Sequence, residues 1–175
     1  MPTIITHAAP VLASGIAVGR RRLPMRLFWL AVVCSMLPDF DVAGFLVGVR
    51  YADLLGHRGF SHSLLFAALC GGAAALAAPL LRCRRRLAAV VAFLAVASHI
   101  FLDALTSGGL GVAAFWPFDE GRFFLPWRPI RVSPFNPRAF ASARGIAVIL
   151  SELRWVWLPC FIAAGGVRLW LEKKK

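Results

Sequence analysis

Five stretches of the chain are apolar enough to cross a lipid bilayer, and they constrain the fold more than any other feature. They cover approximately residues 3–19, 27–49, 62–81, 87–109 and 146–171. A spanning helix needs about 20 apolar residues, so the first stretch is short. Charged residues make up 16% of the 175 residues, against about 25% in soluble domains, and the mean hydropathy is +0.73. The sequence therefore predicts an all-α, multi-pass transmembrane bundle of about four or five helices, forming one integral membrane domain over residues 1–175.

The segment 110–145 has a different composition. It contains FWPFDEGRFFLPWRPIRVSPFNPR, which is rich in proline, aromatic residues and arginine. A proline-rich backbone does not form a lipid-exposed helix, and tryptophan and arginine favour the headgroup zone. We therefore expect an interfacial or re-entrant loop here.

The net charge of +12 is concentrated in short connections between the apolar stretches. The segments 20–26 and 82–86 and the C-terminal tail hold four, four and three basic residues. Anionic headgroups and the preference for positive cytoplasmic loops account for such clusters, so membrane lipids are expected partners and nucleic acid is not. The same count predicts that the N-terminus lies outside the cytoplasm, although arginines in the 110–145 loop weaken that signal.

Histidine and aspartate gather at the opposite level of the predicted bundle. All four histidines and three of the five aspartates would lie toward its outer side: His7, Asp39, Asp41, His57, His62, His99 and Asp103. An unpaired polar group in lipid costs on the order of 2.5–3.5 kcal/mol. Their common depth therefore suggests a shared partner, whereas His7 considered alone is equally consistent with an interfacial side chain.

Local spacing explains how these residues can converge. His99 and Asp103 are four apart in SHIFLDALTSGG, so in a helix they share a face with Thr106. A simple His–Asp pair is the alternative. In MLPDFD the proline opens the helix, which lets both aspartates turn toward one point, although one of them could instead cap the broken helix.

The stretch HRGFSHS at 57–63 brings two further histidines toward the same level. Gly59 permits a tight turn, and Ser61 is a plausible N-cap for the third apolar helix. The two histidines can then converge despite a spacing of five residues, which a single helix would splay.

Together these donors form the inventory of a nitrogen and oxygen metal site, suited to a divalent ion such as zinc, manganese or iron. The four cysteines are far apart and predict no disulfide framework. Seven donors leave room for one or two ions, about 3.5–4 Å apart if there are two, with Asp41 or Asp103 able to bridge. Arg58 could grip a phosphate or anchor a headgroup, and Asp39 could act as general base if it is not a ligand.

The ordered motifs TH, LPDFD, HRGFSHS and SHIFLDALTSGG resemble the YdjM-type family of bacterial inner-membrane proteins, described as membrane-bound metal-dependent hydrolases. The resemblance covers the first two-thirds of the chain, and Ser61 stands where the family commonly has threonine. It implies a multi-pass protein of the bacterial inner membrane with ligand roles for all seven residues. The ligand order is more distantly similar to that of zinc-dependent phospholipase C.

Hydrolysis of an ester or phosphoester at the lipid surface, through a metal-activated water, is the function that these features favour. Three alternatives remain. A metal or proton transporter also places His and Asp inside a bundle. A serine hydrolase could use Ser61 or Ser63, but no Gly-x-Ser-x-Gly context supports either. A non-enzymatic scaffold would use a metal only as structural support.

Overall fold

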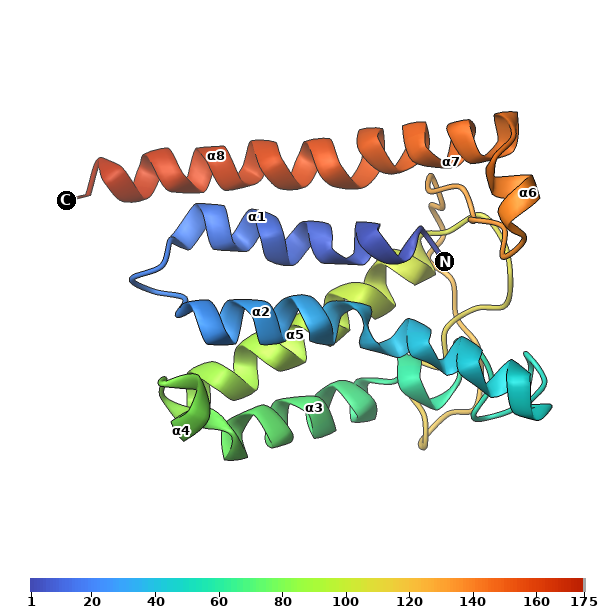
Figure 1. Ribbon diagram of the computed structural model, residues 1–175, viewed down its shortest axis with the longest axis horizontal. Helices are drawn as coiled ribbons and strands as arrows, with labels where there is room; N and C mark the ends of the chain where they lie inside the picture. The colour runs from blue at the N-terminus through green and yellow to red at the C-terminus, as the bar shows by residue number, and fades with distance from the viewer. Residues whose placement is uncertain (175) are drawn as a thin grey trace.

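Apolar helices carry most of the chain in the computed structural model, which describes residues 1–174 (Figure 1). No β-strand occurs among these residues, and two isolated bridges join Thr106 to Ile130 and Val112 to Phe123. The prediction of an all-α protein is confirmed. The elements are η1 (Ile4–Ala8), α1 (Ala9–Val18), α2 (Met25–Met36), η2 (Leu37–Val47), η3 (Phe60–His62), α3 (Leu64–Leu76), α4 (Ala78–Leu81), α5 (Arg85–Ala104), α6 (Pro137–Phe140), α7 (Ala143–Glu152), η4 (Leu153–Trp157) and α8 (Leu158–Glu172).

Three continuous helical stretches are long and apolar enough to cross a membrane: Met25–Val47, Arg85–Ala104 and Ala143–Glu172. Two shorter apolar helices, Ile4–Val18 and Leu64–Leu76, accompany them. All five lie within or around the predicted stretches. The third is shorter than predicted, because the helix ends at Leu76 and Pro79 occupies the first turn of the separate helix α4.

Small residues allow the central helices to approach closely. α5 packs against α2 and α3, and Ala67, Ala74, Ala88 and Ala92 are buried between them. At Gly71 an added Cβ would lie 2.9 Å from the carbonyl oxygen of Ala89, so a larger residue would force the helices apart. Close backbone packing of this kind is a common way for helices to associate in lipid.

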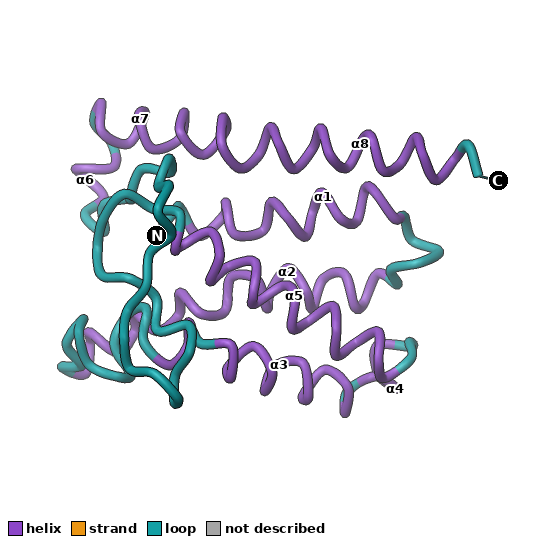
Figure 2. Tube along the Cα trace, turned by 180° about the vertical axis from the view of Figure 1, so that it is seen from behind, coloured by secondary structure: helices purple, strands orange, loops and turns teal. Residues whose placement is uncertain are grey.

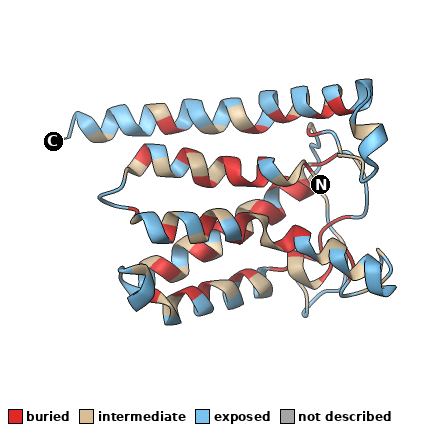
Figure 3. Ribbon diagram, in the orientation of Figure 1, coloured by how far each residue is buried: buried red, intermediate tan, exposed pale blue. Residues whose placement is uncertain are grey.

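The C-terminal rod formed by α7, η4 and α8 lies against α1 (Figure 1). Most of its residues are exposed in Figure 3, and the exposed side chains include large apolar ones such as Ile162 and Leu169. An exposed apolar surface of this kind is suited to contact with lipid. The contact that ties the rod to the N-terminus is polar: the buried carboxylate of Glu152 accepts hydrogen bonds from the Thr3 hydroxyl and the Thr6 hydroxyl, both at 2.7 Å. The sequence motifs had not indicated this role.

The two ends of the bundle differ in chemistry. The α1–α2 turn, the α3–α5 connection and the end of α8 lie together at one end (Figures 1 and 2), so that end holds the basic segments 20–26 and 82–86 together with Lys173 and Lys174. The α2–η2 junction, the 48–63 loop and the end of α5 lie at the other, together with the N-terminus. The three short basic segments therefore lie opposite the His–Asp level, as predicted, while Arg50, Arg58 and the five arginines of segment 110–145 lie on the His–Asp side.

The long connection after α5 is irregular, as predicted, and runs over the His–Asp end (Figure 2). Its C-terminal part was predicted wrongly, because α6 at Pro137–Phe140 and the start of α7 at Ala143 both fall inside the expected loop 110–145. Side-chain caps explain these starts: Asn136 accepts from the backbone of Arg138, and Ser142 accepts from that of Arg144.

We predict that Glu152→Ala lowers the free energy of unfolding by about 1–3 kcal/mol, because buried hydroxyl donors lose their acceptor. Thermal unfolding in detergent measures this change. Glu120→Ala is the matched control, since Glu120 is exposed, and it should leave the unfolding temperature unchanged. Equal unfolding temperatures for the two variants would contradict the role assigned to Glu152.

Candidate metal centre

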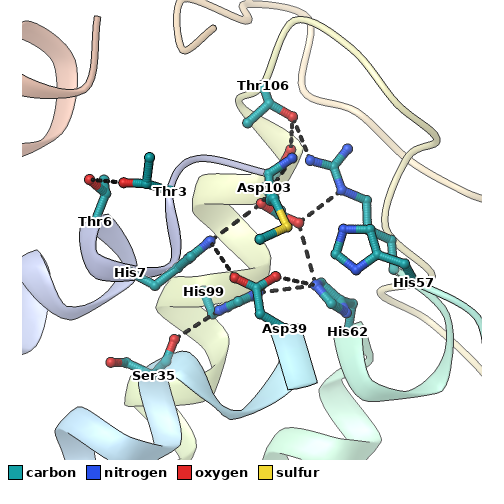
Figure 4. A network of polar contacts seen from close by, with 12 residues as sticks. Thr3, Thr6, His7, Ser35, Asp39, His57, His62, His99, Asp103 and Thr106 are labelled. Carbon is teal, nitrogen blue, oxygen red and sulfur yellow. Dashed lines mark hydrogen bonds and ion pairs between the residues drawn. The ribbon is translucent and has the colours of Figure 1, made fainter. Parts of the chain in front are cut away.

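Five of the seven predicted residues meet in one buried cluster at the end of the bundle, which we call the central cluster (Figure 4). They come from four separate parts of the chain: η1, the start of η2, the 48–63 loop region and the last turns of α5. Each side chain is at most 1% exposed. The members of the central cluster are His7, Asp39, His62, His99 and Asp103.

One half of the central cluster surrounds the Nε2 atoms of two histidines. His62 Nε2 lies 3.0 Å from His99 Nε2 and 3.4 Å from Asp103 Oδ2. Asp39 Oδ1 lies 3.5 Å from His99 Nε2 and 3.9 Å from His62 Nε2. All four donors fall within 4.8 Å of one another.

The other half is formed by His7 and the remaining oxygens of the same two carboxylates. His7 Nε2 lies 3.6 Å from Asp39 Oδ2 and 3.5 Å from Asp103 Oδ1. The His7 ring stacks on the His99 ring with centroids 3.5 Å apart, which holds it against the first half. Both aspartates thus present one oxygen to each half of the central cluster.

Hydrogen bonds determine which ring nitrogens carry protons. His99 Nδ1 lies 2.8 Å from the carbonyl oxygen of Ser35, which can only accept, so this nitrogen is the donor. The Ser61 hydroxyl donates to Asp41 Oδ2 at 2.6 Å, so His62 Nδ1, 3.0 Å from the same hydroxyl and 3.2 Å from Asp41 Oδ2, must also donate. The neutral forms of His62 and His99 therefore present lone pairs at Nε2, 3.0 Å apart.

A cation satisfies this arrangement. Tetrahedral ligands at about 2.0–2.1 Å from a zinc ion lie about 3.3 Å from one another, close to the separations in both halves. Among residues 1–174, the buried side-chain atoms without a hydrogen-bond partner are His7 Nδ1 and Nε2, both oxygens of Asp39, His57 Nε2 and Asp103 Oδ1. Buried polar atoms are rarely left unpaired, and four of these six face into the central cluster. The donor set fits a metal ion.

Asp41 and His57 form an outer pair beside the central cluster. His57 Nδ1 lies 2.7 Å from Asp41 Oδ1, while Asp41 Oδ2 receives Ser61 and faces His62 Nδ1. A carboxylate behind a ligating histidine commonly orients its ring. Donor atoms of Asp41, His57 and His62 also lie within 4.8 Å of one another, close enough to share a metal ion. His62 cannot use Nδ1 as a ligand, however, while that nitrogen donates a proton.

Aromatic side chains cover the outer pair. The His57 ring meets Tyr51 and Phe135 edge to face at 5.2 and 5.4 Å. Burial lowers the pKa of the His57 imidazole below its usual value, while Asp41 acts in the opposite direction. Phe135 is exposed and the Asp41 side chain is 7% exposed, so this side of the site lies near the surface.

Arg58 is completely buried and acts within the protein. Its Nε donates to Asp103 Oδ2 at 2.8 Å, and its Nη2 donates to Thr106 Oγ1 at 2.8 Å. Its Nη1 donates to the carbonyl oxygens of Gly108 and Leu110. The expected contact with a lipid headgroup is wrong, because the guanidinium is not exposed. The expected grip on a substrate phosphate stays a prediction, with four of the five N–H donors already engaged.

The 57–63 segment reaches its shape differently from our expectation. Ser63, not Ser61, is the N-cap of α3 and accepts from the backbone of Phe66 at 3.1 Å. Gly59 has a negative φ, and a Cβ there would overlap the carbonyl oxygen of Leu54, so close approach explains the glycine. The left-handed residue is Arg58, with φ of 67°. Its four side-chain hydrogen bonds offset that strain.

The comparisons with known proteins agree on a family. The family described as YdjM inner membrane protein matches residues 1–174. The chain is 42% identical over 180 residues to the inner membrane protein YbcI of Escherichia coli (strain K12), a match that covers 99% of this chain and all of the relative. No solved structure matches the chain.

We predict that Arg58→Lys destabilises the protein by about 2–4 kcal/mol, because lysine cannot serve four separate acceptors and leaves Asp103 poorly paired. Thermal unfolding in detergent would measure the loss. Arg50→Lys is the control in the same loop, since its side chain is 85% exposed. If Arg58→Lys unfolds at the wild-type temperature, the buried hydrogen bonds of Arg58 do not stabilise the fold.

Proposed function

The chain belongs to the YdjM family of inner membrane proteins, and from this premise we propose that the central cluster binds divalent metal ions and hydrolyses an ester or phosphoester at the membrane surface. The observation that carries the proposal is the pair of Nε2 lone pairs on His62 and His99, which face each other at 3.0 Å beside two buried carboxylates. A divalent cation would satisfy both nitrogens and both carboxylates, whereas a proton shared between the two Nε2 atoms would satisfy only the nitrogens.

Two ions fit the donors better than one. His62 and His99 share Asp39 Oδ1 and Asp103 Oδ2, while His7 shares the opposite oxygens of both aspartates. Asp39 and Asp103 would therefore both bridge, whereas we had expected Asp41 or Asp103 to do so. The half containing His7 has three protein donors, which is typical of a catalytic site with an open position. Nitrogen and oxygen donors suit zinc, and also manganese or iron.

The roles of the remaining residues follow from their contacts. His7, Asp39, His62, His99 and Asp103 would hold the divalent ions, whose chemistry when bound would be to activate water near neutral pH and to stabilise charge on ester oxygens. His57, held by Asp41 through Nδ1 and without a partner at Nε2, is placed to carry a proton to or from the reacting groups. Asp39 offers both oxygens to histidines, which favours a ligand role over that of general base.

The position of the site favours a lipid or lipid-linked substrate. The central cluster lies at the end of the bundle away from the basic segments, and positive loops are typically cytoplasmic. We therefore assign the site to the extracytoplasmic side of the inner membrane. At that depth a substrate presented by the bilayer reaches the aromatic side chains around His57 first.

We predict that purified protein reconstituted with zinc or manganese holds about two ions per chain. His62→Ala removes a donor from the half with two histidines and should abolish binding there. His7→Ala should retain about one ion, because the other half keeps its four donors. Elemental analysis after gel filtration measures both variants, and Asp53→Asn in the exposed part of the 48–63 loop is the control. Folded wild-type protein without metal would overturn the proposal.

We predict that His57→Ala retains the metal content of the wild type but loses hydrolysis by about 10²–10⁴-fold, because proton transfer contributes that much to such reactions. The measurement uses a chromogenic phosphodiester and a short-chain phospholipid in mixed micelles. Asp41→Asn should also lower the rate of hydrolysis. Loss of metal in His57→Ala would make His57 a ligand instead. Bound metal without turnover of any ester would favour a structural site, and metal flux into proteoliposomes would favour a transporter.

A further inference from the structure

A basic cavity lies at the end of the bundle opposite the central cluster. It has a volume of about 520 Å³ and is lined by arginines from two elements that are distant in sequence. Arg20, Arg21 and Arg22 come from the α1–α2 turn, and Arg168 comes from α8. Glu172 also lines it and pairs with Arg168, so three arginines have no acidic partner within the lining.

The backbone of the α1–α2 turn supports this cavity. Gly19 ends α1 with φ of 70°, a conformation that favours glycine, and turns the chain so that three consecutive arginines follow it. A Cβ at Gly19 would lie 3.3 Å from Arg168 Nη1, so the guanidinium of α8 rests against this turn. The arginines are thus gathered by tertiary packing as well as by sequence.

An apolar groove of about 470 Å³ continues from the basic cavity toward the middle of the bundle. Its lining comes from α1, α2 and α5 and includes Val11, Val91 and Leu94. Val18 and Arg22 line both the cavity and the groove, so the two adjoin at these residues. The groove follows α1 from Pro10 to Val18, about 12 Å along a helix.

We propose that this combined site binds one anionic phospholipid, with the phosphate among the arginines and an acyl chain in the groove. Charge complementarity selects the headgroup, because the lining carries an excess of guanidinium groups, which bind phosphate oxygens well. The adjoining groove favours a lipid over a soluble anion, because a free phosphate leaves the apolar groove empty. Basic pockets between membrane helices commonly hold anionic headgroups. The inference does not depend on the metal centre.

Titration with phosphatidylglycerol, followed by native mass spectrometry of the detergent-solubilised protein, tests the site. The arginine variant is Arg21→Gln/Arg168→Gln, and Arg21→Gln/Arg22→Gln replaces it if the first unfolds. The matched control is Arg84→Gln/Arg86→Gln, which removes the same charge from the other basic turn at this end. Val91→Trp fills the groove. Phosphatidylethanolamine with the same chains and glycerol 3-phosphate complete the set of ligands.

We expect one tightly bound phosphatidylglycerol per chain. Its affinity should fall roughly 30-fold in the arginine variant and less than about twofold in the control, since each arginine near the headgroup contributes about fivefold. Val91→Trp should also weaken it. Equal losses in the arginine variant and the control would overturn the proposal in favour of general surface charge. Equal affinities for phosphatidylethanolamine and phosphatidylglycerol would also overturn it. Binding of glycerol 3-phosphate that Val91→Trp leaves unchanged would do the same, because the groove would then play no part. A dimer that Val91→Trp dissociates would overturn it in favour of a second copy of the chain in the groove.

Discussion

The carboxylate of Asp103 organises the end of the bundle on which the proposed chemistry depends. Its Oδ2 accepts from Arg58 Nε at 2.8 Å and lies 3.4 Å from His62, while its Oδ1 faces His7 at 3.5 Å. A buried charge is tolerated only when it is neutralised and hydrogen-bonded. Arg58 and the Met1 ammonium, which lies 3.9 Å from Asp103 Oδ1, supply positive charge to Asp103, whereas among residues 1–174 no hydrogen-bond donor meets either oxygen of Asp39. A divalent cation would provide the partner that Asp39 lacks.

The side chains at this end form an inner layer of donors and an outer layer that orients them. The inner layer is the central cluster, whose donor atoms lie at separations suited to shared metal ions. The outer layer orients it: Asp41 and Ser61 act on His62, and the carbonyl group of Ser35 acts on His99. The irregular backbone after α5 contributes carbonyl acceptors for Arg58. Non-helical backbone of this kind is tolerated at membrane depth when it is buried against protein.

The basic cavity at the opposite end of the molecule is built in part from helices that also reach the central cluster. α1 begins beside His7 in the central cluster and ends at Gly19 in the basic cavity, so one short helix connects the two sites. Glu152 holds the C-terminal rod against the N-terminus at the first end, and Arg168 rests on the α1–α2 turn at the other. A lipid held in the groove would therefore contact α1, which directly follows η1 and His7, and also α2 and α5, which carry Ser35, His99 and Asp103.

The sequence alone determined the membrane class, the five apolar stretches, the position of the three short basic segments opposite the His–Asp level and the residue types of a metal site, because hydropathy, charge and helical spacing are local properties. The tertiary structure decided which ring nitrogen of each histidine faces the centre, that Asp41 lies outside while Asp39 and Asp103 face both halves, and that Arg58 is buried. It also decided the role of Glu152. These outcomes rest on contacts between residues up to 149 positions apart, such as Thr3 and Glu152, and no local pattern encodes which distant donor a buried acceptor will meet.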